Sequence, residues 1–156
     1  MLDEIDIKIL NILQEKARIP NVEVARQVGM APSAVLERIR KLEKNGVIDG
    51  YEVRLNPQRF GSNLVAFVQV YPSGGFDDAA VGGQLAALSE VQEVHFVSGD
   101  DGFLLKLRVA GPEALGRLLR DKVAVIPGIR ATRTTIVLAS YKETAQIPVD
   151  PEAFHP

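Results

Sequence analysis

Residues 21–46 have the sequence NVEVARQVGMAPSAVLERIRKLEKNG, and this stretch decides the fold of the first part of the chain. Pro20 or Asn21 opens a short helix, and Gly29 follows its last apolar residue at a position typical of a helix C-terminus. Pro32 stands in the first turn of the next helix, where proline is tolerated. Two helices separated by a turn of about four residues that contains glycine form the helix-turn-helix signature.

A further helix is predicted before this pair, over residues 3 to 16. Asp3 stands at its N-cap position, and Asp6 follows three residues later, where a carboxylate also suits the helix dipole. The apolar residues recur at helical spacing, and they are Leu2, Ile5, Ile9, Ile12 and Leu13. The N-terminal part therefore predicts three helices.

The helix that contains Pro32 has two chemically different faces. Val35, Ile39 and Leu42 form an apolar stripe that we expect to pack inward. The opposite face carries Ser33, Glu37, Arg40, Lys41 and Lys44, with Arg38 on the flank. Such a mainly basic face also fits an ordinary solvated helix. Its position after the turn favours a recognition helix, which needs a packed back and a polar front that reaches bases and phosphates in the major groove.

From Val47 the pattern becomes extended, and it ends at Asn56 and Pro57, where proline cannot continue a strand ladder. Asp49 and Gly50 fit two interpretations. They could form a hairpin turn that makes a small wing, or a kink in a strand that links this region to the rest of the chain.

Strand and helix patterns alternate in the remaining chain. Strands are predicted over residues 64–71, 93–98, 103–109 and 130–140, and helices over residues 77–89 and 113–124. This βαββαβ order is the ferredoxin-like arrangement. The sequence therefore predicts an α+β protein with an N-terminal helix-turn-helix, winged or not, followed by a ferredoxin-like domain.

The strand patterns indicate how the sheet is covered. On the middle hairpin, one side carries Val94, Phe96, Phe103, Leu105, Leu107 and Val109, and the other carries His95, Val97, Leu104, Lys106 and Arg108. We expect the first side to face the helices. The outer strands, 64–70 and 136–139, are apolar on nearly every residue, which suits a sheet covered on both faces. One βαββαβ unit covers a single face with helices, so we infer that a second copy covers the other in a homodimer.

Net charge, cysteine content and apolar segments limit the kinds of partner and site that the chain can have. The net charge of −2 at pH 7 argues against coating nucleic acid by bulk attraction, so DNA contact must be local. The chain has no cysteine, which excludes disulfides and thiolate metal sites. No basic stretch followed by an apolar run opens the chain, and no segment approaches the roughly 18 to 20 apolar residues that cross a bilayer. We expect a soluble, cytoplasmic protein with no membrane partner.

From Leu2 to about Thr144, the chain resembles the leucine-responsive regulator family, also called Lrp/AsnC or feast/famine regulators. The motifs that carry the resemblance are Leu2-Asp3-Glu4-Ile5-Asp6, Leu36-Glu37-Arg38 with Leu42-Glu43, Gly46-Val47-Ile48-Asp49-Gly50-Tyr51, Leu55-Asn56-Pro57, Val97-Ser98-Gly99-Asp100 and Ile126-Pro127-Gly128. In this order and spacing they are specific. The resemblance implies a transcription regulator that binds double-stranded DNA, assembles as dimers and commonly as octamers, and often responds to amino acids.

With this family in view, the expected organisation has four parts. They are a helix-turn-helix DNA-binding domain over residues 1–50, a linking strand over residues 51–60, a βαββαβ domain for ligand binding and oligomerisation over residues 61–144, and a C-terminal tail over residues 145–156.

The resemblance implies an effector site where subunits meet, near the loop between the second and third strands and near the last strand. Carried onto this chain, the site comprises Ser98, Gly99, Asp100, Asp101, Gly102, Thr132, Arg133, Thr134 and Thr135. Backbone N–H groups and an arginine suit a carboxylate, and carboxylate oxygens suit an ammonium. The same residues also fit an ordinary hairpin turn and a threonine-rich strand.

Two positions depart from the family pattern. Members that respond to amino acids often carry an acidic residue directly before the aromatic of the third strand, where this chain has Gly102. Asp101 precedes it by one residue, and a shift of one in an extended segment turns a side chain to the other face. The effector's identity, and whether one binds, thus stays open. At Ala31 the family often has a capping serine, whose loss costs about 1 kcal/mol, and Ser33 could bond the first-turn amides instead.

Two rival functions remain. Siroheme decarboxylases share this two-domain architecture, and Arg38, Arg40 and Lys41 could hold propionates, but His95 and His155 are the only histidines and no nucleophile–base pair or metal cluster is visible. We therefore expect no enzyme activity, cofactor or metal. The other rival is an architectural protein that bends DNA with little sequence preference. A specific regulator would keep a large affinity ratio between its operator and random DNA.

Overall fold

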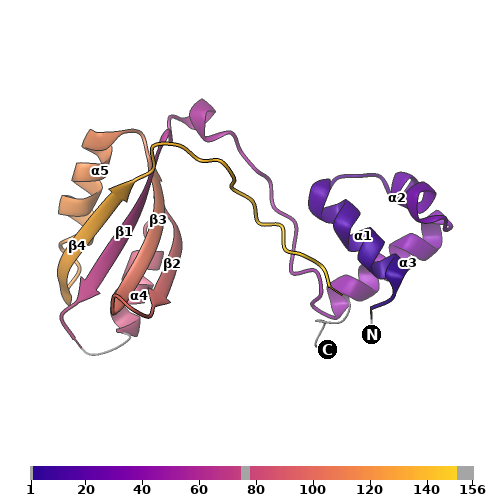
Figure 1. Ribbon diagram of the computed structural model, residues 1–156, viewed down its shortest axis with the longest axis horizontal. Coiled ribbons are helices and arrows are strands. Elements are labelled where there is room, and N and C mark those ends of the chain that lie inside the picture. The colour runs from indigo at the N-terminus through magenta and orange to yellow at the C-terminus, as the bar shows by residue number, and fades with distance from the viewer. Residues whose placement is uncertain (1, 75–77, 151–156) are drawn as a thin grey trace. The chain divides into compact units, whose positions relative to one another are not determined.

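The computed structural model describes residues 2–74 and 78–150, and the chain divides into two compact units (Figure 1). The helical unit comprises Met1–Arg54 and Lys142–Pro156, and the sheet unit comprises Leu55–Tyr141. Among the described helices, none has both the length and the apolar character needed to span a membrane.

The described part of the helical unit contains three helices, as the sequence predicts. They are α1 (Glu4–Glu15), α2 (Asn21–Val28) and α3 (Pro32–Lys44). The Asp3 carboxylate caps α1, since it accepts hydrogen bonds from the backbone N–H groups of Ile5 and Asp6 at 2.9 and 2.8 Å. The Asp6 carboxylate accepts one in return from the Asp3 backbone N–H at 3.2 Å. This reciprocal capping box explains why the chain becomes helical directly after Asp3.

Gly29 makes the turn between α2 and α3. Its φ of +71° lies in the left-handed region, which glycine adopts without steric cost. The Met30 N–H then donates to the Ala25 carbonyl at 3.0 Å, as in other helices that end at glycine. α3 begins without a side-chain cap, because Ala31 has no side-chain oxygen and Ser33 makes no hydrogen bond in the described part of the chain. The expected compensation by Ser33 does not occur.

The last described residues, which belong to the predicted C-terminal tail over residues 145–156, pack with the helical unit. Gln14 on α1 holds Ile147 twice. Its Nε2 donates to the Ile147 carbonyl at 3.0 Å, and its Oε1 accepts from the Ile147 N–H at 2.8 Å. Gln146 Nε2 donates to the Gln14 carbonyl at 3.1 Å. Val149 packs against the core that the three helices share, so this segment is part of the fold.

The segment after α3 differs from the sequence prediction. Residues 49–56 form no strand, so neither a wing hairpin nor a linking strand is present in the described chain. An extended pattern yields a strand only where a neighbouring strand completes its hydrogen bonds, and the described sheet contains no strand that pairs with this segment. Pro57–Phe60 form a short 3-10 helix instead, and Asn56 Oδ1 caps it by accepting from the Gln58 N–H at 3.0 Å.

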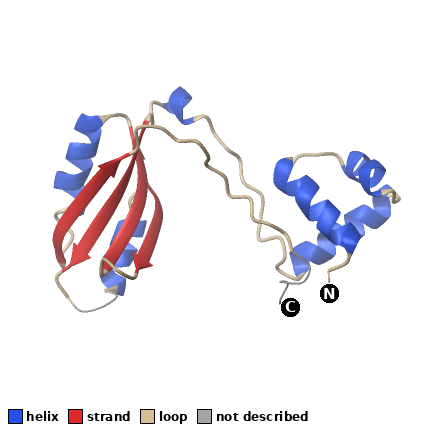
Figure 2. Cartoon of the chain, in the orientation of Figure 1, coloured by secondary structure: helices blue, strands red, loops and turns tan. Residues whose placement is uncertain are grey.

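The sheet unit has the βαββαβ order that the sequence predicts (Figure 2). Its strands pair antiparallel in the order β2-β3-β1-β4, which is the ferredoxin-like arrangement. The elements are β1 (Leu64–Pro72), α4 (Ala79–Ala86), β2 (Val91–Val97), β3 (Gly102–Val109), α5 (Pro112–Leu118), which continues as a π-helical turn over Leu119–Val123, and β4 (Ile129–Ile136). Asp77, the expected start of a helix, lies outside the described residues, and Asp78 caps α4.

β4 is shorter than the sequence predicts. It ends at Ile136, because its partner β1 begins at Leu64 and the last bond between them runs from the Val137 N–H to the Val65 carbonyl at 2.9 Å. Leu138 lies beyond the strand and is 96% exposed. The residues after Ile136 therefore do not form the buried outer strand that we expected, and this part of the case for a two-sided sheet is wrong.

α4 and α5 cover one face of the sheet (Figure 2). Val94 and Phe96 pack against the core under these helices, so the predicted division of the middle hairpin into two faces is confirmed. The buried side chains of this core are Ala66, Val68, Val70, Val81, Leu85, Phe103, Leu105, Leu107, Val109, Leu115, Leu118, Val123 and Ile126.

The other face of the sheet, called the open face below, carries no helix in the described chain (Figure 2). Residues directly opposite each other on paired strands share a face. The registers therefore assign to the open face Val65, Phe67, Gln69 and Tyr71 of β1, Glu93, His95 and Val97 of β2, Leu104, Lys106 and Arg108 of β3, and Ala131, Arg133 and Thr135 of β4. Most charges on it lie on β2 and β3, whereas its β1 row is uncharged.

Candidate nucleic-acid interface and ligand site

α3 presents the two faces that its sequence predicts. Val35, Ile39 and Leu42 are buried in the core of the helical unit. The opposite face is exposed and carries Ser33, Glu37, Arg40, Lys41 and Lys44. Its three basic side chains form no hydrogen bond or ion pair within the described part of the chain. Their donors are thus free for a partner outside the chain.

Arg38, on the flank of α3, is tied to the start of α1. Its Nη1 donates to Asp3 Oδ2 at 2.7 Å and to Asp6 Oδ1 at 2.8 Å. The Asp6 backbone N–H, and after it this guanidinium, lowers the pKa of Asp3, and the two carboxylates raise the pKa of Arg38. The sequence grouped Arg38 with the DNA-facing side chains. In the structure it has carboxylate partners in its own unit, with which a phosphate would have to compete.

Tyr51 is a residue of this surface that the sequence reasoning did not single out. Its hydroxyl donates to Glu43 Oε1 on α3 at 2.9 Å. Burial, and then this bond to a carboxylate, raises the pKa of Tyr51 to about 12. The contact fixes the irregular segment that follows α3 against the helix, so it holds the chain beside the basic face.

The turn between β2 and β3 contains the first part of the predicted ligand site. Ser98, Gly99, Asp100 and Asp101 are all exposed. Asp101 has a φ of +37°, in the left-handed region that residues other than glycine seldom adopt. Neither carboxylate of the turn has a hydrogen-bond partner within the described chain. Both are therefore available to accept hydrogen bonds from a ligand.

Gly102 begins β3 and is buried. A Cβ atom at this position would overlap the backbone carbonyl oxygen of Val70 on β1. Any side chain here would force one of the two strands to move, which overpacked sites resist. The close approach of β1 gives a physical reason for the departure from the family pattern, because an acidic residue does not fit this backbone.

The predicted residues of β4 do not share one face. Thr132 and Thr134 pair with β1 residues of the helix-covered face, whereas Arg133 and Thr135 pair with residues of the open face. Gly102 also belongs to the open face by its register on β3. The structure thus brings Arg133 and Gly102 to the same surface and separates them from Thr132 and Thr134.

Gln69 is a second residue that the sequence reasoning missed. It lies on the open face of β1, is only 9% exposed, and its Nε2 has no hydrogen-bond partner in the described chain. This Nε2 is 3.3 Å from the point where a Cβ of Gly102 would lie. The available signal was a single polar side chain inside the apolar strand sequence LVAFVQVYP, because such a residue is seldom buried without a polar partner.

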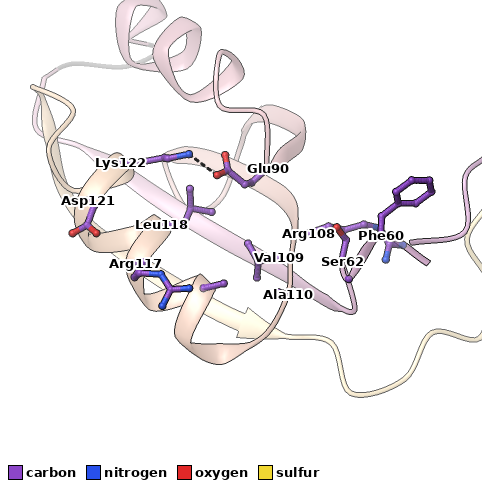
Figure 3. Close-up of a pocket in the computed structure, with 12 residues that line it drawn as sticks. Phe60, Ser62, Glu90, Arg108, Val109, Ala110, Arg117, Leu118, Asp121 and Lys122 are labelled. Carbon is purple, nitrogen blue, oxygen red and sulfur yellow. Dashed lines mark hydrogen bonds and ion pairs between the residues drawn. The ribbon is translucent and has the colours of Figure 1, made fainter. Parts of the chain in front are cut away.

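A cleft of about 470 Å³ lies beside α5 and the end of β3 (Figure 3). Phe60, Arg108 and Arg117 are among its lining residues. Figure 3 shows Lys122 hydrogen-bonded to Glu90 across it, and this bond lowers the pKa of the Glu90 carboxyl. None of the sequence-predicted site residues lines the cleft. Because two of its charges pair with each other, we assign no ligand to it.

One of the two histidines, His95, lies in the described part of the chain. His95 is exposed on β2, and its Nε2 lies 3.3 Å from Glu93 Oε2. No cluster of His, Cys, Asp or Glu suited to a metal ion occurs among the described residues. His155 lies outside them.

Two family models match the chain. A winged helix-turn-helix DNA-binding model matches residues 2–49, which contain all of α1 to α3. A model of the Lrp/AsnC ligand binding domain matches residues 65–147, which contain most of the sheet unit.

Relatives agree with both models. The leucine-responsive regulatory protein of Haemophilus influenzae is 41% identical over 145 residues, 92% of this chain and 87% of that protein. A transcriptional regulator of Neisseria meningitidis in complex with L-methionine has a TM-score of 0.90 at 29% identity, over 95% of this chain and 97% of that one. The feast or famine regulatory protein of Mycobacterium tuberculosis with L-methionine has a TM-score of 0.84 at 33% identity, over 94% and 99%. The chain therefore belongs to the Lrp/AsnC family of DNA-binding transcription regulators.

Proposed function

We propose that this regulator reads specific sequences in double-stranded DNA through the exposed face of α3, and that an amino acid bound in the sheet unit modulates it. The observation that carries the proposal is the set of three basic side chains on α3, which follows a helix-turn-helix turn and whose basic groups have no partner among the described residues. No observation on the described chain favours the enzyme or the architectural alternative.

The side chains of α3 divide the DNA contacts by chemistry. Arg40 can donate two hydrogen bonds to a guanine edge, and Glu37 can accept one from cytosine N4. Lys41, Lys44 and Ser33 suit phosphates, which fix the position of the helix on the duplex. Because Arg38 is held by Asp3 and Asp6, its first role is to orient α3 on α1, and a phosphate contact by Arg38 is secondary.

The open face fits a second copy of the chain. Its β1 row includes Val65, Phe67 and Tyr71, and Phe67 is 36% exposed. A sheet face with large apolar side chains is stable only when another layer covers it. We expect a homodimer through this face, in which two α3 helices address two half-sites. Assembly of dimers into octamers is typical of the family and is our expectation here.

For the effector, we propose an amino acid at the turn between β2 and β3. Two solved relatives hold L-methionine. In this chain the carboxylates of Asp100 and Asp101 are exposed and unpaired within the described residues, which suits a ligand ammonium group. On β4, Arg133 and Thr135 share the open face with Gly102, so they are better placed than Thr132 and Thr134.

DNA reading is tested with an operator selected from random duplexes. Anisotropy titrations compare the chain carrying Arg40→Ala and Lys41→Ala with a control carrying Arg117→Ala and Arg120→Ala, which loses the same charge from the sheet unit. We expect a loss of roughly 100-fold or more for the first variant and little change for the second. Equal affinities for the two variants would overturn the α3 assignment. Equal affinity of the unmodified chain for operator and scrambled DNA would favour the architectural alternative.

Effector binding is tested by calorimetric titration with each of the twenty amino acids, starting with methionine, while light scattering reports the mass. We expect saturable binding that Asp101→Ala weakens. If none of the twenty amino acids binds, the proposal of an amino-acid effector is wrong, and the proposal of DNA reading is unaffected.

A further inference from the structure

We propose that Gln69 and Arg133 form a carboxylate-binding pair on the open face, beside Gly102. The inference rests on the proposed effector function and extends it, because it names the ligand group that is bound, a carboxylate, and the two residues that bind it.

The first observation is the unpaired amide of Gln69. The side chain is nine-tenths buried, and its Nε2 has no hydrogen-bond partner in the described chain. A buried donor without an acceptor costs free energy, and native proteins seldom keep one unless a ligand, partner or water completes it. The buried Gln69 amide is therefore destabilising in this strand until a hydrogen-bond acceptor from another molecule pairs with it.

The second observation is the place to which this amide points. Gly102 has no side chain because the backbone of Val70 on β1 approaches it closely, and Gln69 Nε2 lies 3.3 Å from the position that a Cβ of Gly102 would occupy. Gly102 directly follows the turn that carries Asp100 and Asp101. The free donor on the interior strand β1 is therefore close to the end of β3 that adjoins the predicted effector loop.

The third observation is the residue opposite Gln69. The β1–β4 register pairs Gln69 with Arg133, and directly opposed side chains have Cβ atoms about 4.5 to 5.5 Å apart. Arg133 forms no hydrogen bond or ion pair within the described residues. Among the described residues of this face, the acidic side chain is Glu93, which lies on β2 and contacts His95. Within the described residues, no carboxylate of the same copy serves the pair.

An amide N–H donor beside a guanidinium offers several hydrogen-bond donors and a positive charge, and this combination favours a carboxylate. The carboxylate belongs either to the amino-acid effector or to an acidic side chain of a second copy across the open face. For an amino acid, the pair holds the carboxylate end, and the exposed carboxylates of the turn face the ammonium end. The absence of an acidic residue at position 102 then leaves the donor side of the site free of repulsion.

The test uses the full chain with three variants and two controls. Gln69→Glu replaces the amide donor with a negative charge, and Gln69→Met removes it at similar volume. Arg133→Gln lies on an exposed edge strand, so it repeats the test without a buried charge. Gln84→Glu, at an exposed position of α4, and Arg117→Gln, at an exposed position of α5, are the matched controls. The probes are L-methionine titration by calorimetry and mass by light scattering.

We expect the three variants to bind L-methionine at least tenfold more weakly than the controls, with unchanged mass, which assigns the carboxylate to the effector. A fall in mass that the controls do not show assigns it to a second copy and also supports the pair. Wild-type methionine affinity and mass in Gln69→Met and Arg133→Gln would overturn the pair while leaving the effector function intact. Failure of the effector function itself looks different, because the unmodified chain then binds none of the twenty amino acids.

Discussion

The helical unit and the sheet unit present their functional surfaces in opposite ways. α3 buries its apolar stripe in its own unit and turns a charged face outward. The sheet buries one face under α4 and α5 and leaves an open face on which Phe67 is 36% exposed. A charged surface is stable in water until its partner arrives, whereas an apolar sheet face needs another apolar layer. Under the proposed function, one copy carries a whole DNA-reading surface and half of an assembly surface.

The two units also differ in the number of chain segments that form them. The sheet unit is one continuous segment, Leu55–Tyr141, and the helical unit uses both ends of the described chain. Gln14 and Ile147 join those ends by reciprocal hydrogen bonds. The helical unit is thus more than its helix-turn-helix, and four substitutions can separate the requirements of the two units.

Gly102→Glu is expected to have the largest effect, and to break the sheet unit alone. The new side chain overlaps the Val70 backbone, so we expect a loss of about 3 kcal/mol or more in unfolding free energy. Hydrogen exchange read by mass spectrometry should be faster than in the wild type at β1 and β3, and it should be unchanged at α1, α2 and α3. Gly83→Glu is the control, since no atom lies within 4 Å of its Cβ position. Equal protection in the two variants would contradict the close approach of β1.

Phe67→Glu tests whether the open face is a surface between copies. Burying a phenylalanine is worth about 2 kcal/mol, so we expect self-association to weaken by roughly 30-fold while the fold is kept. Val22→Glu, at an exposed apolar position of α2, should leave the association constant unchanged. Analytical ultracentrifugation over a concentration series measures both. If the two variants associate equally well, the open face is not the contact.

Gln14→Ala tests whether the C-terminal segment belongs to the helical unit. Removal of the bonds to Ile147 should cost about 1 to 2 kcal/mol, since each net hydrogen bond contributes about 1 kcal/mol. Exchange at α1 amides should rise. Gln27→Ala removes a surface bond to Glu23 within α2 and should change little. A C-terminal segment that stays protected in Gln14→Ala would show that these bonds do not hold it.

Arg38→Gln should have the smallest effect, about 1 kcal/mol or less at neutral pH, because the ion pair is partly exposed to solvent. The folded-state pKa of Asp3 is lowered from its ordinary 3.8. Its contribution is therefore full above that value and is lost as the pH falls through the lowered pKa. The difference in unfolding temperature between Arg38→Gln and the wild type, measured from pH 7 to pH 2, should therefore shrink toward the acid end. Arg40→Gln is the control, since Arg40 is exposed and has no partner among the described residues, and its stability should equal that of the wild type at every pH.

Much of the helical unit could be predicted from the sequence, because its signals are local. The Asp3 cap, the Gly29 turn and the two faces of α3 each depend on residues within about one turn of each other. The strand order and the faces of the middle hairpin also followed from period-two patterns. In each case the residues that stabilise the element lie close to one another in the sequence, so the pattern is visible without the structure.

The sequence reasoning failed where a pattern needed a distant partner. The extended residues 49–56 have no strand beside them, and β4 ends where β1 begins. Gln69 went unnoticed because its importance lies in its position beside Gly102, which is 33 positions further along the chain. Periodicity reports which face a residue takes and says nothing about what lies opposite.

By itself, the sequence determined the helix-turn-helix, the βαββαβ order and the basic face of α3, since helix caps, glycine turns and hydrophobic periods act over a few residues. Only the tertiary structure decided which charges are free and which are held. Arg38 meets Asp3 across 35 positions, and Gln14 meets Ile147 across 133. Such pairs form because packing of whole elements places them together, and no local propensity encodes that distance.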